Sequence, residues 1–260
     1  MSIKYKRILL FFLCTSVFTC AALVIYILKS SPDTYYTENF TTITLFDLVE
    51  SIPCDSENEI CDQSEFSPFV EVGQASGLAF KTIGDKTYIL TADHFCSHND
   101  YEYSFYYDVA ALFPEQMMAI TDVKGNVTYG VPIYTDRDLD LCLIETDAMN
   151  VPDIDVSLTM PTHGEKVYTI SAPQGTSGLG YVIHLEGRFS GCDEETVFCF
   201  FSIPATFGSS GSLILDQDGD IVGMIQMTQP GLQFISIGVG SDQIFIFLYE
   251  ASSHLGISLL

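Results

Sequence analysis

The chain has 260 residues, 47% of them hydrophobic, so it can form a folded core and is not a disordered polymer. It carries 10 Lys plus Arg against 34 Asp plus Glu, a formal net charge of −24 at pH 7. A field of this sign repels nucleic acid and anionic membrane surfaces. Nucleic-acid partners are therefore not expected, whereas a preference for basic substrates and a role in solubility are both open.

The first 30 residues differ from the rest of the chain. Lys4, Lys6 and Arg7 precede an uncharged apolar run over residues 8–28. At about 1.5 Å per residue, a helix over this run can span the roughly 30 Å hydrocarbon core of a bilayer. A cleavable signal peptide has a shorter apolar stretch and a small-residue cleavage site. We therefore predict a single transmembrane signal anchor, with residues 1–7 in the cytoplasm and the chain from residue 29 exported to the cell surface, a secretory lumen or the periplasm.

The exported part begins with a polar segment and contains cysteines that can pair. Residues 29–65 are rich in Ser, Thr, Asp and Glu, and we expect a stalk or N-terminal extension there. Two cysteine pairs are each seven residues apart around a polar segment, which suits small loop-closing disulfides in an oxidising compartment: Cys54 with Cys61, and Cys192 with Cys199. Cys142 lies within an apolar stretch and is expected to be a small buried thiol.

From residue 66 onward, short apolar stretches alternate with turns that contain Gly, Asp, Asn or Pro. Many short strands separated by such turns predict an all-β barrel or sandwich over residues 66–260. The best candidate for a helix is residues 242–255 at the C-terminus. There, four apolar residues have helix-like spacing: Ile244, Phe245, Phe247 and Leu248.

Three short patterns with chemical potential stand in one order along this β-rich part. "YILTADHFC" ends a strand near His94, "DRDLDLCLIE" opens a strand with acidic residues, and "FGSSGSLILDQDGDIVGM" places Ser210 between glycines before a strand. His, Asp and Ser in this order match one of the chain orders of the hydrolytic triad. A lone Gly-x-Ser-Gly stretch is more often a turn, but three ordered signals at strand ends favour a triad.

Each of these residue types meets a requirement of acyl transfer. A serine hydroxyl needs a base within hydrogen-bond reach, and an imidazole has a pKa suited to that task. The imidazole needs a carboxylate that fixes its tautomer, for which Asp138 and Asp140 are both candidates. Glycine at position 208 permits a loop in which the N–H groups of Gly208 and Ser210 turn inward to form an oxyanion hole.

Residues 70–248 resemble a trypsin-like serine protease domain, and within that family its HtrA-like branch. "ASGLAFKTIGDKTYILTADH" resembles the Gly-Ser-Gly, two-strand, Thr-x-x-His opening of the family, and "GEKVYTISAPQG" resembles its Gly-x-x-Val-x-x-Ile-Gly-x-Pro-x-Gly segment. "GSSGSLILDQDGDIVGM" resembles Gly-Asn-Ser-Gly-Gly-Pro-Leu and the hairpin that follows, and "FISIGVGSDQI" resembles the run before the last helix.

This resemblance implies two six-stranded antiparallel β-barrels with a C-terminal helix and an active site between the barrels. It implies His94 as the general base and Ser210 as the nucleophile. Strands of the family begin Asp-Leu-Ala-Leu-Leu, which the frame starting at Asp140 fits better than the frame starting at Asp138. Asp140 is therefore predicted to be the triad acid.

The resemblance also implies a primary specificity pocket. The pocket floor falls near Pro204 and Ala205, and with Ile225 and Met227 it predicts a medium-sized apolar pocket. The sequence departs from the family pattern at three positions. The departures are Asp93 before the histidine, Ser212 after the serine motif, and Ser209, which stands where digestive trypsins have the Asp that pairs with a freed N-terminus. Activation by such an N-terminal switch is not expected, and the short C-terminus predicts that no PDZ domain follows.

We therefore predict a membrane-anchored, exported serine endopeptidase that acts on proteins or peptides. No cofactor is implied, and no metal site is expected because no histidine pairs with Cys, Asp or Glu at a metal-ligand spacing. The oligomeric state is left open. Two alternatives also stay open, namely a catalytically silent relative that serves as an anchored binding or adhesion module, and an exported esterase on the same fold.

Overall fold

The computed structural model describes residues 36–48, 69–97, 116–177, 181–193, 195–229 and 231–260. The predicted cytoplasmic segment, the signal anchor over residues 8–28 and the Cys54/Cys61 pair lie outside these residues. Within the described part of the chain, no helix is both long and apolar enough to cross a membrane.

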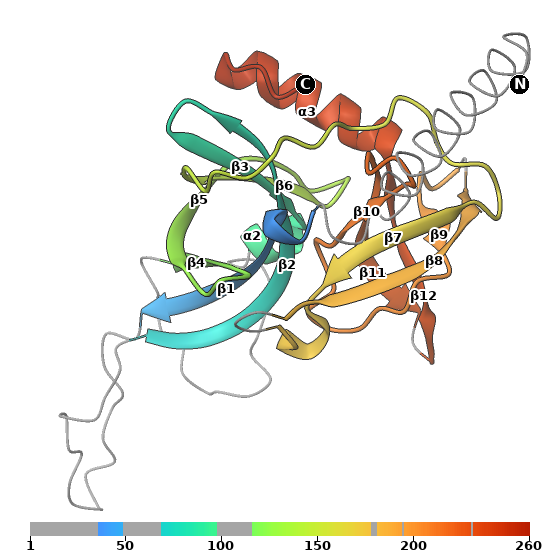
Figure 1. Ribbon diagram of the computed structural model, residues 1–260, viewed down its shortest axis with the longest axis horizontal. Coiled ribbons are helices and arrows are strands. Elements are labelled where there is room, and N and C mark those ends of the chain that lie inside the picture. Colours follow the sequence, from blue (N-terminus) through green and yellow to red (C-terminus); the bar gives the residue numbers. More distant parts are fainter. Residues whose placement is uncertain (1–35, 49–68, 98–115, 178–180, 194, 230) are drawn as a thin grey trace, which may run out of the picture. The chain divides into compact units, whose positions relative to one another are not determined.

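The first half of the described chain forms a closed barrel with the strand order β1-β2-β3-β6-β5-β4 (Figure 1). Its six strands are β1 (Phe40–Leu48), β2 (Phe69–Ile83), β3 (Lys86–Thr91), β4 (Gln116–Asp122), β5 (Val127–Asp136) and β6 (Leu141–Asp147). A 3-10 turn, η2 (Thr37–Asn39), leads into β1, and a short helix, α2 (Asp93–Cys96), follows β3. The barrel interior is filled by branched apolar side chains such as Ile43, Ile89 and Ile144, each fully buried.

Strand β1 corrects the predicted domain boundary. The sequence predicts a stalk over residues 29–65, whereas residues 40–48 pair with β2 on one side and residues 41–47 pair with β4 on the other. Ile43 and Leu45 enter the core, and the neighbouring Thr41, Thr42 and Thr44 lie in the paired sheet. Threonine is polar but β-branched, so a Thr-rich segment suits a strand as well as a solvated extension. The barrel therefore starts before residue 66.

The second half forms another closed barrel, with the strand order β10-β11-β12-β9-β8-β7 (Figure 1). Its six strands are β7 (Lys166–Ser171), β8 (Ile183–Cys192), β9 (Cys199–Phe201), β10 (Leu213–Leu215), β11 (Ile221–Gln229) and β12 (Leu232–Gly240). A 3-10 turn, η5 (Pro173–Gly175), follows β7. All named strand pairs are antiparallel, so the predicted pair of six-stranded antiparallel barrels is confirmed.

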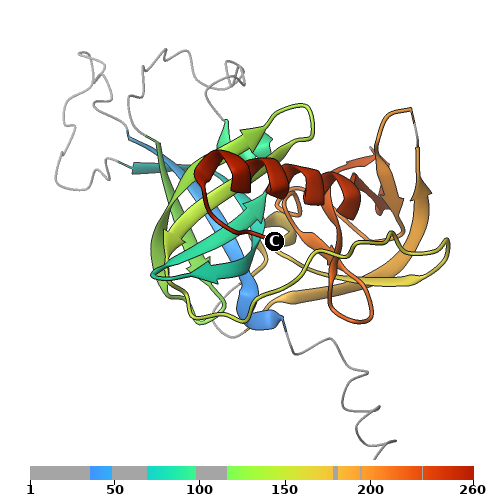
Figure 2. The ribbon, with the colours of Figure 1, turned by 90° about the horizontal axis from the view of Figure 1, so that it is seen from above.

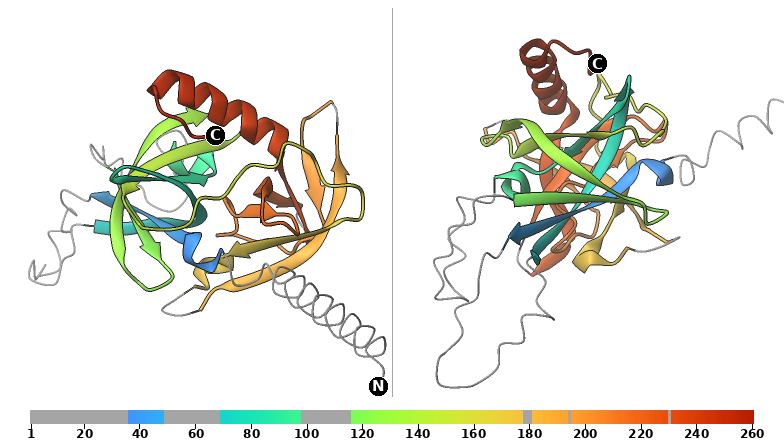
Figure 3. Two further views of the ribbon diagram at one scale, coloured as in Figure 1. Left: turned by 45° about the horizontal axis from the view of Figure 1, so that its top comes forward. Right: turned by 90° about the vertical axis from the view of Figure 1, so that its left-hand side faces the viewer.

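The predicted C-terminal helix is also confirmed as α3 (Ser241–Leu255), which ends at Gly256 in the left-handed conformation that commonly stops a helix. Figures 2 and 3 show α3 running across the barrels. Its buried face joins a core cluster that takes Leu78 and Leu141 from the first barrel and Leu213 from the second. The ring of Phe247 lies 5.3 Å from that of Tyr134 on β5. This shared apolar core holds the two barrels as one unit.

Two disulfides lie in the described part. Cys192 pairs with Cys199 where β8 meets β9, as the spacing predicts. Cys142 is not the free thiol that the sequence predicts, because it is bonded to Cys96 in α2 across 46 residues of sequence. Only the fold brings the first strand residues of β6 next to α2, and no local spacing signals that bond.

Candidate active site

His94 and Asp140 meet at one end of the first barrel. The Nδ1 atom of His94 lies 2.8 Å from one carboxylate oxygen of Asp140 and 3.1 Å from the other. The backbone N–H of His94 donates a second hydrogen bond, of 2.7 Å, to the same carboxylate. Because a carboxylate only accepts, Nδ1 carries the proton and Nε2 is left as the basic nitrogen. Asp140, rather than Asp138, therefore contacts the ring.

Local folding explains this contact. Strands β3 and β6 pair antiparallel with Thr91 opposite Cys142, so the residues that follow β3 and those that precede β6 lie at the same end of the sheet. Asp140 has a φ of 49°, a left-handed backbone that few non-glycine residues adopt and that Asp tolerates better than most. The disulfide between Cys96 and Cys142 joins positions two residues beyond each member of the pair.

Ser210 is connected to this pair through Gln226. The Ser210 hydroxyl donates a hydrogen bond of 3.0 Å to the backbone carbonyl of Gln226 in β11. The side-chain amide of Gln226 donates to the backbone carbonyls of Leu139 and Asp140, the latter at 3.1 Å. Among the described residues, the Ser210 hydroxyl makes no hydrogen bond with the ring of His94.

Sequence reasoning missed Gln226. Its side chain is 3% exposed and lies in a strand whose neighbouring residues are apolar, "IVGMIQM". A buried amide costs free energy unless it is hydrogen-bonded. A single polar residue in the otherwise apolar buried part of this strand is a signal that could have identified it.

The loop of Ser210 is shaped by its glycines. Gly208 has a φ of 86°, and a side chain there would meet the carbonyl oxygen of Ala172. Gly211 has a φ of 83°, and a side chain there would meet Ser76 and Thr91 of the first barrel. Both positions therefore require glycine for backbone conformation and for close approach.

The two predicted oxyanion donors are free to bind a ligand. In the part of the chain that the structure describes, the N–H groups of Gly208 and Ser210 have no hydrogen-bond acceptor. The carbonyl of each donor's peptide group is nevertheless held. Phe207 O accepts from the N–H of Gln174 at 2.6 Å, and Ser209 O accepts from the N–H of Ser212 at 3.1 Å.

Ser76 of β2 ties this loop to the first barrel. Its N–H donates to the carbonyl of Ser210 at 2.9 Å, and its hydroxyl donates to the carbonyl of Gly208 at 2.7 Å. The same hydroxyl accepts a hydrogen bond of 3.0 Å from the N–H of Ala172. Ser76 is fully buried, so these bonds are shielded from competing water. Sequence reasoning did not identify this residue as part of the site.

Asp93 departs from the family pattern and is buried, with 2% of its surface exposed. The Ser97 hydroxyl donates a hydrogen bond of 2.7 Å to its carboxylate. Burial is the main cause that raises the pKa of Asp93 above its usual value, and the nearby charge of Asp140 adds to the effect. The carboxylate is thus a buried acid one residue before His94.

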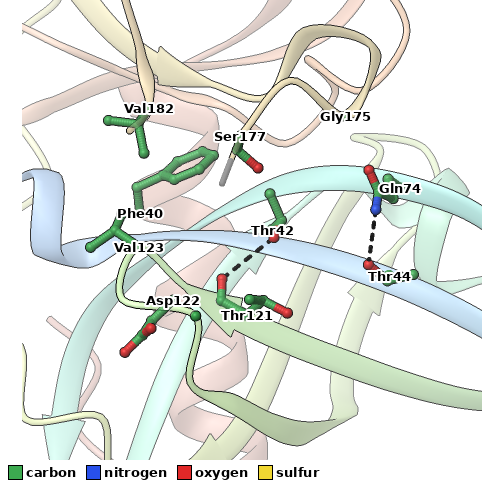
Figure 4. Close-up of a pocket in the computed structure, with 11 residues that line it drawn as sticks. Phe40, Thr42, Thr44, Gln74, Thr121, Asp122, Val123, Gly175, Ser177 and Val182 are labelled. Carbon is green, nitrogen blue, oxygen red and sulfur yellow. Dashed lines mark hydrogen bonds between the residues drawn. The ribbon is translucent and has the colours of Figure 1, made fainter. Parts of the chain in front are cut away.

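A cavity of about 340 Å³ lies where β1, β2 and the β4–β5 turn face the segment around η5 (Figure 4). Much of its lining is polar, with Thr42, Thr44, Gln74 and Ser177 among its residues. It includes none of the four residues predicted to form the specificity pocket. Among those four, Ala205 and Ile225 are buried, whereas Pro204 and Met227 are exposed. Their substrate-binding role stays a prediction.

No group of three or more His, Cys, Asp or Glu side chains within the described ranges is arranged to hold a metal ion. The site itself offers His94, Asp140, Ser210 and two N–H groups that have no acceptor in the described part of the chain. A base oriented by a carboxylate, a hydroxyl nearby and a pair of unengaged donors are the parts that acyl transfer uses.

Comparisons with known proteins identify the family and the fold of the chain. A family model described as a trypsin-like peptidase domain matches residues 75–224, a segment that contains His94, Asp140 and Ser210. Among solved structures, a serine endoprotease from Yersinia pestis matches with a TM-score of 0.60 and 16% sequence identity over 85% of this chain. The chain spans 65% of the length of that protein. No curated protein matches the sequence significantly.

Proposed function

The chain belongs to the trypsin-like peptidase family, and from this premise we propose that it is a serine endopeptidase with the triad His94, Asp140 and Ser210. The observation that carries this assignment is the contact of 2.8 Å between His94 Nδ1 and Asp140. The position of Ser210 supports the assignment further, because Gln226 links the hydroxyl of Ser210 to the backbone of Asp140.

In the proposed mechanism, His94 is the general base. Its Nδ1–H is donated to Asp140, so Nε2 accepts the proton of Ser210 as Oγ attacks the scissile carbonyl carbon. Asp140 stabilises the imidazolium that forms, and its bond from the His94 N–H keeps the carboxylate in place. Before the attack, the Ser210 hydroxyl has to leave the Gln226 carbonyl and turn toward Nε2.

The tetrahedral intermediate places a negative charge on the former carbonyl oxygen. We assign its stabilisation to the N–H groups of Gly208 and Ser210, which have no acceptor in the described part of the chain. One such donor contributes about 10²–10³ in kcat. His94 then gives its proton to the leaving amine, and water hydrolyses the acyl-enzyme by the same base and donors.

We also propose that residues 8–28 anchor the enzyme in a membrane and that the protease domain is exported, with proteins or peptides as its substrates. The length of the apolar run and the positive cluster before it support the anchor. Two disulfides in the described part support an oxidising compartment. Alkaline extraction and protease protection of the full chain in membranes test this, and release as a soluble protein would contradict it.

The triad is tested by labelling the purified chain with a fluorophosphonate probe and mapping the modified residue by mass spectrometry. We expect an adduct on Ser210 that is lost in His94→Ala. An unlabelled but folded protein would contradict the triad and favour an anchored binding module. Labelling together with hydrolysis of a small acyl ester, but no cleavage of any peptide library, would favour an esterase.

A further inference from the structure

The turn η5 contains a strained residue that contacts the oxyanion loop. Gln174 has a φ of 53° and a ψ of 36°, so its backbone is left-handed although it has a side chain. A non-glycine residue in this conformation costs roughly 1–2 kcal/mol compared with the right-handed form. In this conformation, the N–H of Gln174 donates a hydrogen bond of 2.6 Å to the carbonyl oxygen of Phe207.

That hydrogen bond determines the direction of one oxyanion donor. The carbonyl of Phe207 and the N–H of Gly208 belong to the same peptide group. A trans peptide is planar, and its C=O and N–H bonds point in opposite directions. Because Gln174 holds the carbonyl on the η5 side, the N–H of Gly208 is directed away from η5, where no described residue accepts it.

The second donor does not depend on a distant residue. The N–H of Ser210 belongs to the peptide group of Ser209, whose carbonyl is held by the N–H of Ser212 in the same loop. By contrast, the peptide group before Gly208 is held from a segment more than 30 residues earlier in the chain. Glycine at 208 offers little resistance to rotation of this peptide group, because it lacks a Cβ atom.

Hydrogen bonds around η5 hold Gln174 in its strained conformation. The N–H of Gly175 donates to Ala172 O at 3.0 Å, and the N–H of Thr176 donates to Pro173 O at 3.0 Å. The N–H of Ala172 donates to the hydroxyl of Ser76. Backbone strain kept by several bonds at a site usually has a mechanistic use.

We propose that Gln174 is a positioning residue of the oxyanion hole, acting through its left-handed backbone N–H rather than through its side chain. This inference rests on the proposed triad and deepens it. Gln174 does not touch the reacting atoms, but its conformation decides whether the Gly208 N–H faces the substrate carbonyl. We therefore expect kcat to be lower when residue 174 is of a type that disfavours the left-handed conformation.

The test compares Gln174→Gly, which adopts this conformation freely, with Gln174→Val, whose β-branched side chain opposes it. We expect Gln174→Gly to keep kcat within about 3-fold of wild type. Gln174→Val should lower kcat by about 10- to 100-fold with little change in KM, which approaches the loss of kcat expected when one oxyanion donor is removed. The rate of fluorophosphonate labelling and the affinity for a peptide aldehyde, which forms a tetrahedral adduct, should fall with kcat.

Asn150 provides the matched control. It is exposed and has a φ of 51°, so Asn150→Val imposes a similar backbone penalty outside the oxyanion loop. We expect that variant to lower Tm about as much as Gln174→Val while leaving kcat unchanged. Gln174→Thr, which is also β-branched but polar, replaces the Val variant if the latter does not fold.

Three negative results are distinguishable. If wild type labels at Ser210 and Gln174→Val has the kcat, labelling rate and aldehyde affinity of wild type, the positioning role is wrong and the triad stands. If Gln174→Gly loses as much kcat as Gln174→Val, the side chain rather than the backbone matters, and the proposal is also wrong. If folded wild type does not label, the proposed triad fails, and the positioning role fails with it.

Discussion

The two barrels hold their parts of the active site by different means. In the first barrel, His94 and Asp140 lie next to paired strands, and a disulfide joins the residues two positions beyond each of them. In the second barrel, Ser210 lies in a glycine-containing loop that is held by two hydrogen bonds from Ser76 and one from η5. His94 and Asp140 therefore have a covalently braced frame, whereas Ser210 and the N–H groups of Gly208 and Ser210 depend on hydrogen bonds that can rearrange.

The disulfides sharpen this contrast. The Cys96–Cys142 bond links α2 to β6 directly beside His94 and Asp140. The Cys192–Cys199 bond joins paired residues of β8 and β9 and closes a segment of only seven residues. One disulfide thus braces the site, and the other braces a hairpin.

Removing the nucleophile of the second barrel should have the largest effect. Ser210→Ala deletes the hydroxyl but leaves the backbone bonds of the loop, including the bond from the Ser76 N–H. We expect kcat for a peptide substrate to fall by roughly 10⁶-fold. The free energy of unfolding should change by only about 1 kcal/mol, for one lost hydrogen bond. Activity close to wild type in the purified variant would remove Ser210 from the mechanism.

Removing the acid of the first barrel should have the next largest effect. Asp140→Asn keeps the shape of the side chain but allows the wrong histidine tautomer, for which we expect a loss of about 10⁴ in kcat. Asp138→Asn is the matched control, two residues earlier in the same segment, and should be close to wild type. A larger loss from Asp138→Asn than from Asp140→Asn would transfer the role to Asp138.

Removing each disulfide in turn should separate its effect on kcat from its effect on the free energy of unfolding. Replacing Cys96 and Cys142 together by Ser opens a segment of 46 residues, and chain entropy predicts a loss of about 4 kcal/mol in the free energy of unfolding. The same change at Cys192 and Cys199 should cost roughly 2 kcal/mol. We also expect kcat to fall in the first double variant only. Urea denaturation and steady-state kinetics measure both, and equal kcat losses would contradict the contrast.

The smallest effect should come from the buried acid of the first barrel. Burial raises the pKa of Asp93, so the folded protein binds this proton more tightly than the unfolded chain does. The contribution of Asp93 to the free energy of unfolding should therefore fall as pH rises from the unfolded pKa, near 3.8, through the raised folded value. Asp93→Asn should remove this loss while still accepting the bond from Ser97.

The measurement is urea denaturation of wild type and Asp93→Asn over a pH series. The stability of the variant relative to wild type should increase as pH rises through that window. A difference that does not vary with pH, or that decreases as pH rises, would show that burial does not penalise the Asp93 carboxylate.

Local patterns allowed much of the fold to be predicted. Alternating apolar strands, turn residues and the apolar spacing of the last helix are properties of short segments, and they indicated a β-rich domain that ends in α3. The strand β1 was missed because threonine fits both a polar extension and a strand. Its pairing with β2 and β4 depends on residues 21 or more positions away, which no local pattern shows.

The candidates His94 and Ser210 and the Cys192–Cys199 bond follow from residue type and local spacing, whereas the preference for Asp140 over Asp138 follows from the resemblance to the strand pattern of the family. The Cys96–Cys142 bond, the amide of Gln226 and the hydroxyl of Ser76 were decided by tertiary structure alone. The orientation of the Gly208 peptide group belongs with them, because a turn from another part of the chain holds its carbonyl. Sequence therefore determined which chemical groups are present, and contacts between distant segments determined which way those groups point.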